Sequence, residues 1–164
     1  MIRFCGLPHQ VSAFSDRRLN KLEAEDTLVG MIKFKNGILG TVEATTAARP
    51  KDYEASITII GEKGIIEIGG VALNKITKWE IKGQKNLEKK IKRKYSENVP
   101  NAYGFSHFRI FNEVINNILK KKNISPVSIN EAVKSLKLVH TFYSSIEKKK
   151  WINYSSNLAN SKKL

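Results

Sequence analysis

The sequence predicts an α+β fold, an open and mostly antiparallel β-sheet with helices packed on one face. Two observations lead to this expectation. The first half of the 164-residue chain alternates apolar and polar residues in short runs separated by turn signals, whereas the chain from Ser106 onward shows helical periodicity. Runs of strands followed by helices are typical of α+β domains. The length suits one domain with a real core and is too short for two full-sized enzyme domains.

Six strands are expected before residue 83, at residues 10–14, 27–35, 38–47, 55–60, 65–68 and 76–82. Asn36-Gly37 stands between the second and third and predicts a tight hairpin, because both turn positions tolerate positive φ. The second to fifth strands carry apolar residues on both faces, whereas a sheet with one wet face would alternate cleanly. We expect helices on one face and a partner on the other, for which a second copy of the chain is one candidate.

The second half is expected to contain two helices. Residues 83–101 are charged and without a clear period, which predicts a long mobile connection. A first helix follows from Ser106 and a second after the capping box Ser128–Glu131. Their expected apolar stripes are Phe108, Phe111, Val114, Ile115, Ile118 and Leu119 in the first, and Ile129, Ala132, Val133, Leu136, Val139, Tyr143 and Ile146 in the second. Residues 151–153 suit a short last strand, the domain is expected to span 1–154, and 155–164 form a polar tail.

The net charge of +14 is concentrated in one half of the chain. Residues 1–81 carry 11 basic and 10 acidic side chains, whereas residues 82–164 carry 18 and 5. A nucleic-acid or anionic-surface patch is one interpretation. The other is a solvated, lysine-rich exterior, which we favour because only 6 of the 29 basic residues are arginine and no aromatic residues interleave the lysine runs.

Several function classes are excluded by the composition. No apolar stretch approaches the ~20 residues of a membrane span, and residues 1–14 lack the apolar segment of a signal peptide. One cysteine, Cys5, permits no internal disulfide, so a cytoplasmic protein is the default expectation. The three histidines show no metal-ligand spacing, and neither a glycine-rich dinucleotide motif nor a P-loop is present. We therefore expect no metal site.

His107 is the histidine whose surroundings suggest a role. It follows a glycine-containing loop, residues 101–106, that enters a helix. The first turn of a helix offers free N–H groups and a positive dipole end, which suits an anionic ligand. The imidazole and the Tyr103 hydroxyl could contact a sugar or a phosphate there. The alternative is an ordinary helix start with a packed aromatic ring.

Three stretches together resemble a known family. Residues 25–41 run Glu-Asp-Thr through Phe-Lys-Asn-Gly-Ile-Leu-Gly-Thr, and residues 59–74 contain Ile-Ile-Gly-Glu-Lys-Gly and Ile-Glu-Ile-Gly-Gly-Val-Ala-Leu-Asn. The third combines Tyr-Gly-Phe-Ser-His at 103–107 with residues 126–145. In this order they resemble the C-terminal domain of the Gfo/Idh/MocA oxidoreductases, nearest to the branch of UDP-N-acetylglucosamine and UDP-N-acetylglucosaminuronate 3-dehydrogenases.

The resemblance implies that cofactor binding and catalysis belong to a domain other than this one. Family members carry an N-terminal Rossmann domain that binds NAD(P), a catalytic lysine and a catalytic histidine. All would lie upstream of Met1, since residues 1–6 resemble the helix that follows the histidine. The C-terminal sheet forms a wall of the substrate pocket and the oligomer interface. We therefore expect no catalytic or cofactor-binding residue in this chain, no turnover by the chain alone, and NAD or NADP only in the full-length enzyme.

The resemblance also implies candidate substrate contacts. His107 and Tyr103 lie where the related branch has a Gly-x-Gly-His type element, although Ser106 replaces the second glycine and leaves the loop geometry open. Arg17, Arg18 and Arg49 could reach an anionic sugar nucleotide, and surface solvation is the alternative for each. We expect a homodimer through the open sheet face.

Two other functions remain alternatives at this point. The basic second half would suit a nucleic-acid-binding module, which we consider the weaker option. A scaffold that pairs with a full-length paralogue through the sheet would also use this domain without catalysis.

Overall fold

The computed structural model describes residues 1–155, which fall into two compact units. The first unit combines Met1–Ala47 with the chain from Val127 onward, and the second is Ala48–Pro126. In sequence, the second unit is therefore an insertion into the first.

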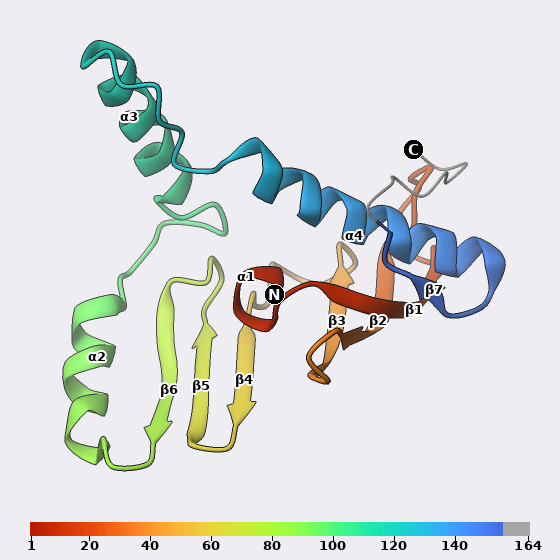
Figure 1. Ribbon diagram of the computed structural model, residues 1–164, viewed down its shortest axis with the longest axis horizontal. Helices are drawn as coiled ribbons and strands as arrows, with labels where there is room; N and C mark the ends of the chain where they lie inside the picture. Colours follow the sequence, from red (N-terminus) through yellow and green to blue (C-terminus); the bar gives the residue numbers. More distant parts are fainter. Residues whose placement is uncertain (156–164) are drawn as a thin grey trace. The chain divides into compact units, whose positions relative to one another are not determined.

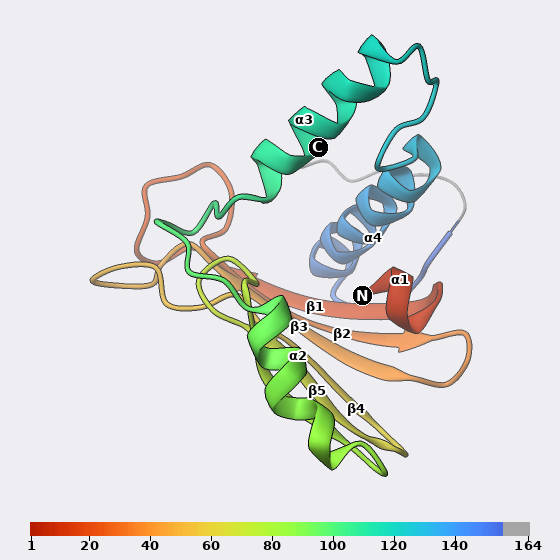
Figure 2. The ribbon, with the colours of Figure 1, turned by 90° about the vertical axis from the view of Figure 1, so that its left-hand side faces the viewer.

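The first unit is an antiparallel four-stranded sheet with a long helix on one face. The strands are β1 (Pro8–Asp16), β2 (Thr27–Phe34), β3 (Leu39–Thr45) and β7 (Ile152–Asn153), in the order β3-β2-β1-β7. Helix α1 (Ile2–Cys5) precedes β1, and α4 (Ile129–Lys148) runs along one face of the sheet in Figure 2. The Ser128 hydroxyl accepts the Glu131 backbone N–H at 3.3 Å, which confirms the predicted start of α4.

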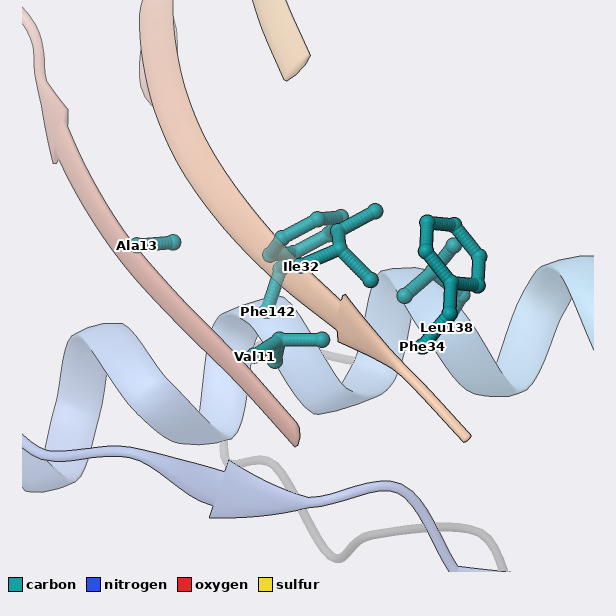
Figure 3. Packing of buried hydrophobic residues seen from close by; sticks show 6 residues of the cluster. All are labelled: Val11, Ala13, Ile32, Phe34, Leu138 and Phe142. Atoms are coloured by element: carbon teal, nitrogen blue, oxygen red, sulfur yellow. The ribbon is translucent and has the colours of Figure 1, made fainter. Parts of the chain in front are cut away.

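The core of the first unit lies between this sheet and α4. Its buried apolar side chains are drawn in Figure 3: Val11, Ala13, Ile32, Phe34, Leu138 and Phe142. Gly30 pairs with Ala13 across the two strands and lies beneath the Phe142 ring. A β-carbon on Gly30 would stand 2.6 Å from the Phe142 ring edge, so only glycine lets the helix approach this closely. The predicted hairpin is also confirmed: Phe34 donates its N–H to the Ile38 carbonyl at 2.8 Å.

The second unit contains a three-stranded antiparallel sheet and two further helices (Figure 1). Its strands are β4 (Ile57–Gly61), β5 (Gly64–Gly69) and β6 (Lys75–Ile81), in the order β4-β5-β6. The helical elements are η1 (Lys85–Leu87), α2 (Glu88–Tyr95) and α3 (Ser106–Leu119). Helix α2 packs beside β6. A β-carbon on Gly64 would stand 1.9 Å from the Glu80 carbonyl oxygen, so the β4–β5 turn requires glycine.

The structure confirms the α+β class and all the expected strands, with bounds within about three residues. The prediction that residues 83–101 form a mobile connection is wrong, because η1 and α2 lie within them. Helix α2 carries only one apolar pair at helical spacing, Ile91 and Tyr95, among lysines and arginine. Its packing on β6 stabilises a segment whose own pattern is too weak to predict.

The expected apolar stripe of α4 is mostly wrong. Leu136, Val139 and Ile129 are exposed, and the buried face instead carries Leu138 and Phe142 with three small polar residues, Thr141, Ser144 and Ser145. Ser145 bridges helix and sheet, since its hydroxyl accepts the Ala13 N–H at 3.1 Å and donates to the Lys150 carbonyl at 2.7 Å. Small hydroxyl residues bring the helix close to the sheet but add nothing to an apolar stripe.

Helix α3 forms where predicted, but its apolar stripe is not covered by the other described residues of the second unit. None of its 14 residues is buried, and Phe108, Phe111 and Ile118 are each about two-thirds exposed. The expected polar tail at 155–164 lies, apart from Ser155, outside the described residues.

Gly30→Ala tests the packing of α4 on the sheet. The added methyl group would overlap a ring that is itself buried, so we expect the free energy of unfolding to fall by about 1–3 kcal/mol. Gly61→Ala is the matched control, because the nearest atom to its β-carbon is 3.8 Å away. Urea unfolding of both variants measures the difference, and equal stabilities would contradict the close approach.

Candidate functional site

The loop before α3 is a defined turn that presents Tyr103 and His107. The Asn101 side-chain oxygen accepts the Tyr103 N–H at 3.0 Å, and the Asn101 carbonyl accepts the Gly104 N–H at 3.1 Å. Gly104 has φ +58, a conformation that favours glycine. Ser106 is the first residue of α3 and needs no such conformation. The observed loop therefore requires no glycine at position 106.

Tyr103 and His107 form a ring pair at the start of α3. Their centroids lie 6.2 Å apart with the planes at 67°, an edge-to-face arrangement. Both side chains are exposed, Tyr103 by 77%. No side chain caps the N-terminus of α3, where Phe105 occupies the cap position. A phenol, an imidazole and a helix N-terminus thus lie together and can donate hydrogen bonds to a ligand rich in hydroxyl or phosphate oxygens.

An ion pair connects α3 to the chain that follows α2. Arg109 donates to both carboxylate oxygens of Glu97, at 2.9 and 2.6 Å. The hydrogen bond from Arg109 lowers the pKa of Glu97, and the same bond raises the pKa of Arg109. The Glu97 backbone in turn pairs with buried Asn74, whose side-chain nitrogen donates to the Glu97 carbonyl at 2.7 Å.

The sequence did not single out Asn74, Glu97 or Arg109. Glu97 stands at the end of a charged run and Arg109 on the polar side of an amphipathic helix. Neither position carries a local pattern that would predict their pairing, since twelve residues and a loop separate them.

Arg17 and Arg18 belong to a loop of the first unit that is folded around Asp26. The Asp26 carboxylate is 3% exposed, and one of its oxygens accepts the backbone N–H groups of Arg18, Leu19 and Asn20 at 2.7–3.1 Å. These bonds, Asn20 first and Leu19 next, lower the pKa of Asp26 from 3.8 to about 2. Within the same loop, Arg17 donates to the Leu22 carbonyl and Arg18 to the Asp16 carboxylate.

The four predicted contact residues divide between the two units. Arg17 lies in the first unit, and Arg49, Tyr103 and His107 lie in the second. The structure brings Tyr103 and His107 together. Exposed Arg49 precedes Pro50 and donates to the carbonyl of its neighbour Ala48 at 2.8 Å.

Within residues 1–155, no three histidine, cysteine or acidic side chains gather closely enough to hold a metal ion. No helix of the described part has the length and apolar character needed to cross a bilayer.

Comparison with known proteins gives a family match and a set of similar structures. The family description "Oxidoreductase family, C-terminal alpha/beta domain" (GFO_IDH_MocA_C) matches residues 2–154. A search of curated protein sequences finds no match.

Two similar structures are WlbA dehydrogenases in complex with NADH and UDP-GlcNAcA. The chain is 28% identical to the enzyme from Chromobacterium violaceum, with a TM-score of 0.79, over 96% of this chain and 43% of that one. The Bordetella pertussis enzyme gives the same identity and TM-score over 95% and 44%. An NAD-binding oxidoreductase from Klebsiella pneumoniae, 13% identical with a TM-score of 0.69 over 95% and 47%, shares the fold. The chain spans less than half the length of these proteins.

The buried Asp26 carboxylate predicts a specific loss of stability in acid. A carboxyl whose pKa is lower in the folded than in the unfolded state stabilises the fold above its unfolded pKa, here 3.8. That contribution is lost as the pH falls from about 4 to about 2. Asp26→Asn should therefore be less stable than the wild type at pH 6, and the difference should shrink toward pH 2.

Urea unfolding between pH 6 and pH 2 measures this convergence. Asp52→Asn, which removes an exposed carboxylate, is the control and should follow the wild type throughout. A constant difference between Asp26→Asn and the wild type at every pH would contradict the assignment.

Proposed function

This chain belongs to the Gfo/Idh/MocA oxidoreductase family, and we propose that it forms the substrate-side, C-terminal domain of an NAD(P)-dependent dehydrogenase acting on a sugar nucleotide. The observation that carries the proposal is the 28% identity and 0.79 TM-score shared with two WlbA dehydrogenases, both in complex with NADH and UDP-GlcNAcA. The Klebsiella pneumoniae oxidoreductase is less similar and supports the fold alone.

The dinucleotide itself does not fit the residues that the structure describes. Such cofactors bind where a parallel strand meets a helix N-terminus through a glycine-rich turn. All the strand pairs within residues 1–155 are antiparallel, and the helices follow loops without that motif. We assign no part of hydride transfer to these residues and expect the chain alone to be inactive.

Tyr103 and His107 are the proposed substrate contacts in the second unit. A sugar nucleotide offers hydroxyl groups and a diphosphate, and the pair offers an imidazole and a phenol beside an uncapped helix N-terminus. Arg49, also exposed in this unit, can add a cation toward the diphosphate. Arg17 is proposed as a separate cationic substrate contact on the first unit, where it donates a hydrogen bond to the Leu22 carbonyl.

The open faces of the sheets support the proposed self-association. In the first unit, the face opposite α4 carries Phe14 and Val29 as direct cross-strand neighbours, 73% and 46% exposed. Met31 and Leu39 extend this apolar surface along β2 and onto β3. An exposed apolar surface of this kind is typical of an interaction site, and we propose a homodimer formed face to face through β2 to β6.

The exposed stripe of α3 supports a role within a larger enzyme. Phe108, Phe111 and Ile118 lie uncovered within the second unit, and the WlbA chains are more than twice as long as the part that this chain matches. We propose that this stripe packs against further parts of the dehydrogenase.

Ligand binding by the chain tests the proposed function. UDP-GlcNAcA should bind saturably in calorimetry, and His107→Ala should weaken the affinity by roughly ten- to a hundredfold through loss of a hydrogen bond to a charged group. His9→Ala, which removes an exposed histidine in β1 of the other unit, should leave the affinity unchanged.

Turnover is measured in the same preparation. The chain mixed with NAD and UDP-GlcNAcA should produce no NADH absorbance above background. Sustained turnover would overturn the expected inactivity, and failure of the wild type to bind the sugar nucleotide would overturn the proposed substrate class.

Self-association is tested by charge placed on the open sheet face. Val29→Glu combined with Met31→Glu, both on β2, should raise the dimer dissociation constant by about tenfold or more, because two apolar contacts that the dimer would bury on each protomer are replaced by like charges. Tyr53→Glu, at an exposed aromatic residue outside the strands, is the control. Light scattering across a concentration series gives the constants, and a wild type that stays monomeric at high concentration would contradict the dimer.

A further inference from the structure

Helix α3 carries His107 but has little to hold it in place. None of its residues is buried, and its N-cap residue Phe105 makes no side-chain capping bond. A helix of 14 residues is marginally stable without packing of one face. The position of His107 in the second unit must therefore depend on contacts outside the helix.

A clasp centred on Asn74 holds the chain that leads to α3. Asn74 stands in the turn before β6 and is 9% exposed. Its carbonyl accepts the Glu97 N–H at 2.9 Å, and its side-chain nitrogen donates to the Glu97 carbonyl at 2.7 Å. Its side-chain oxygen also accepts the Ala72 N–H at 3.2 Å. One buried amide thus joins the turn before β6 to the segment after α2.

The Glu97 side chain extends this clasp to α3. Its two oxygens accept a two-point hydrogen bond from Arg109, which fixes the direction of the guanidinium as well as its distance. Arg109 also donates its backbone N–H to the Phe105 carbonyl at 3.1 Å, in the first turn of α3. His107 lies in that turn, between Phe105 and Arg109 in the sequence.

A second contact reaches the same turn from the loop side. A β-carbon on Gly104 would stand 3.1 Å from the Ala72 side chain, so the loop that carries Tyr103 lies directly against Ala72. Ala72 is the residue whose N–H the Asn74 side chain holds. The loop that carries Tyr103 therefore contacts Ala72, and the helical turn that carries His107 is linked through Arg109 and Glu97 to Asn74.

We propose that Asn74, Glu97 and Arg109 are positioning residues, which set the geometry of the Tyr103–His107 pair through a strut that runs from the turn before β6 to the first turn of α3. This inference rests on the proposed function, in which the pair contacts the sugar nucleotide. The strut pre-orients the two rings before a ligand arrives, and a smaller fraction of correctly oriented rings lowers the apparent affinity in proportion.

Arg109→Gln and Glu97→Gln test the strut, each removing one partner of the ion pair. In ligand-free protein, each should abolish the proton–proton NMR contacts between the Tyr103 and His107 rings. Each should also weaken UDP-GlcNAcA binding by roughly tenfold, as the oriented fraction falls. The charge-exchanged double variant, Glu97→Arg with Arg109→Glu, should restore both signals in large part.

Glu88→Gln and Lys92→Gln are the matched controls. They break a comparably exposed ion pair of 2.8 Å within α2, in the same unit but away from α3. They should leave the ring contacts and the affinity unchanged, which separates a positioning effect from a general loss of surface charge.

The outcomes are distinguishable. Ring contacts and affinity that persist in Arg109→Gln and Glu97→Gln, or that fall equally in the α2 controls, would overturn the strut. If the wild type fails to bind UDP-GlcNAcA while the ring contacts still vanish in both variants, the positioning role stands and the proposed substrate class fails.

Discussion

The approach of Phe142 to Gly30 is the contact on which the arrangement of the chain depends. It joins a helix near the end of the chain to a strand near its beginning, more than a hundred residues earlier. Because α4 packs on β1 and β2 in this way, both ends of the inserted second unit leave from one folded body.

The strands were predictable from the sequence, and the sides of the helices were not. The alternation along β2 and the Asn36-Gly37 turn are local signals in the sequence, and the antiparallel pairing of β2 with β3 is the hairpin that they predict. Helix α4 has apolar residues around most of its circumference, so periodicity alone does not indicate which side is buried. The side that packs on the sheet carries Ser145 and Thr141, whose small polar side chains allow close packing. Helix α2 was not predictable because its own apolar pattern is weak and its stability comes from packing on β6.

In the candidate site, the two ring residues were predictable from the sequence, whereas the residues that support them were not. The loop around Tyr103 and His107 could be found because a glycine, an aromatic ring and a histidine stand within five residues at a helix start. Its support could not, because Asn74 and Glu97 meet only when the chain passes β6 and α2. An Asn side chain that pairs with a distant backbone leaves no trace in spacing or periodicity. The two rings stand close together in the sequence, whereas the residues that we propose to position them are brought together by the fold.

The ion pair also affects the electrostatic potential near the start of α3, in the basic half of the chain. Glu97 is the carboxylate that the structure places next to the start of α3, and Arg109 neutralises it while lowering its pKa. The helix N-terminus therefore keeps its positive potential near Tyr103 and His107, within a half of the chain that carries 18 basic against 5 acidic side chains. Long-range attraction of this sign speeds the encounter with an anion and falls with ionic strength. A diphosphate-bearing substrate would benefit from it without any contact to the individual lysines.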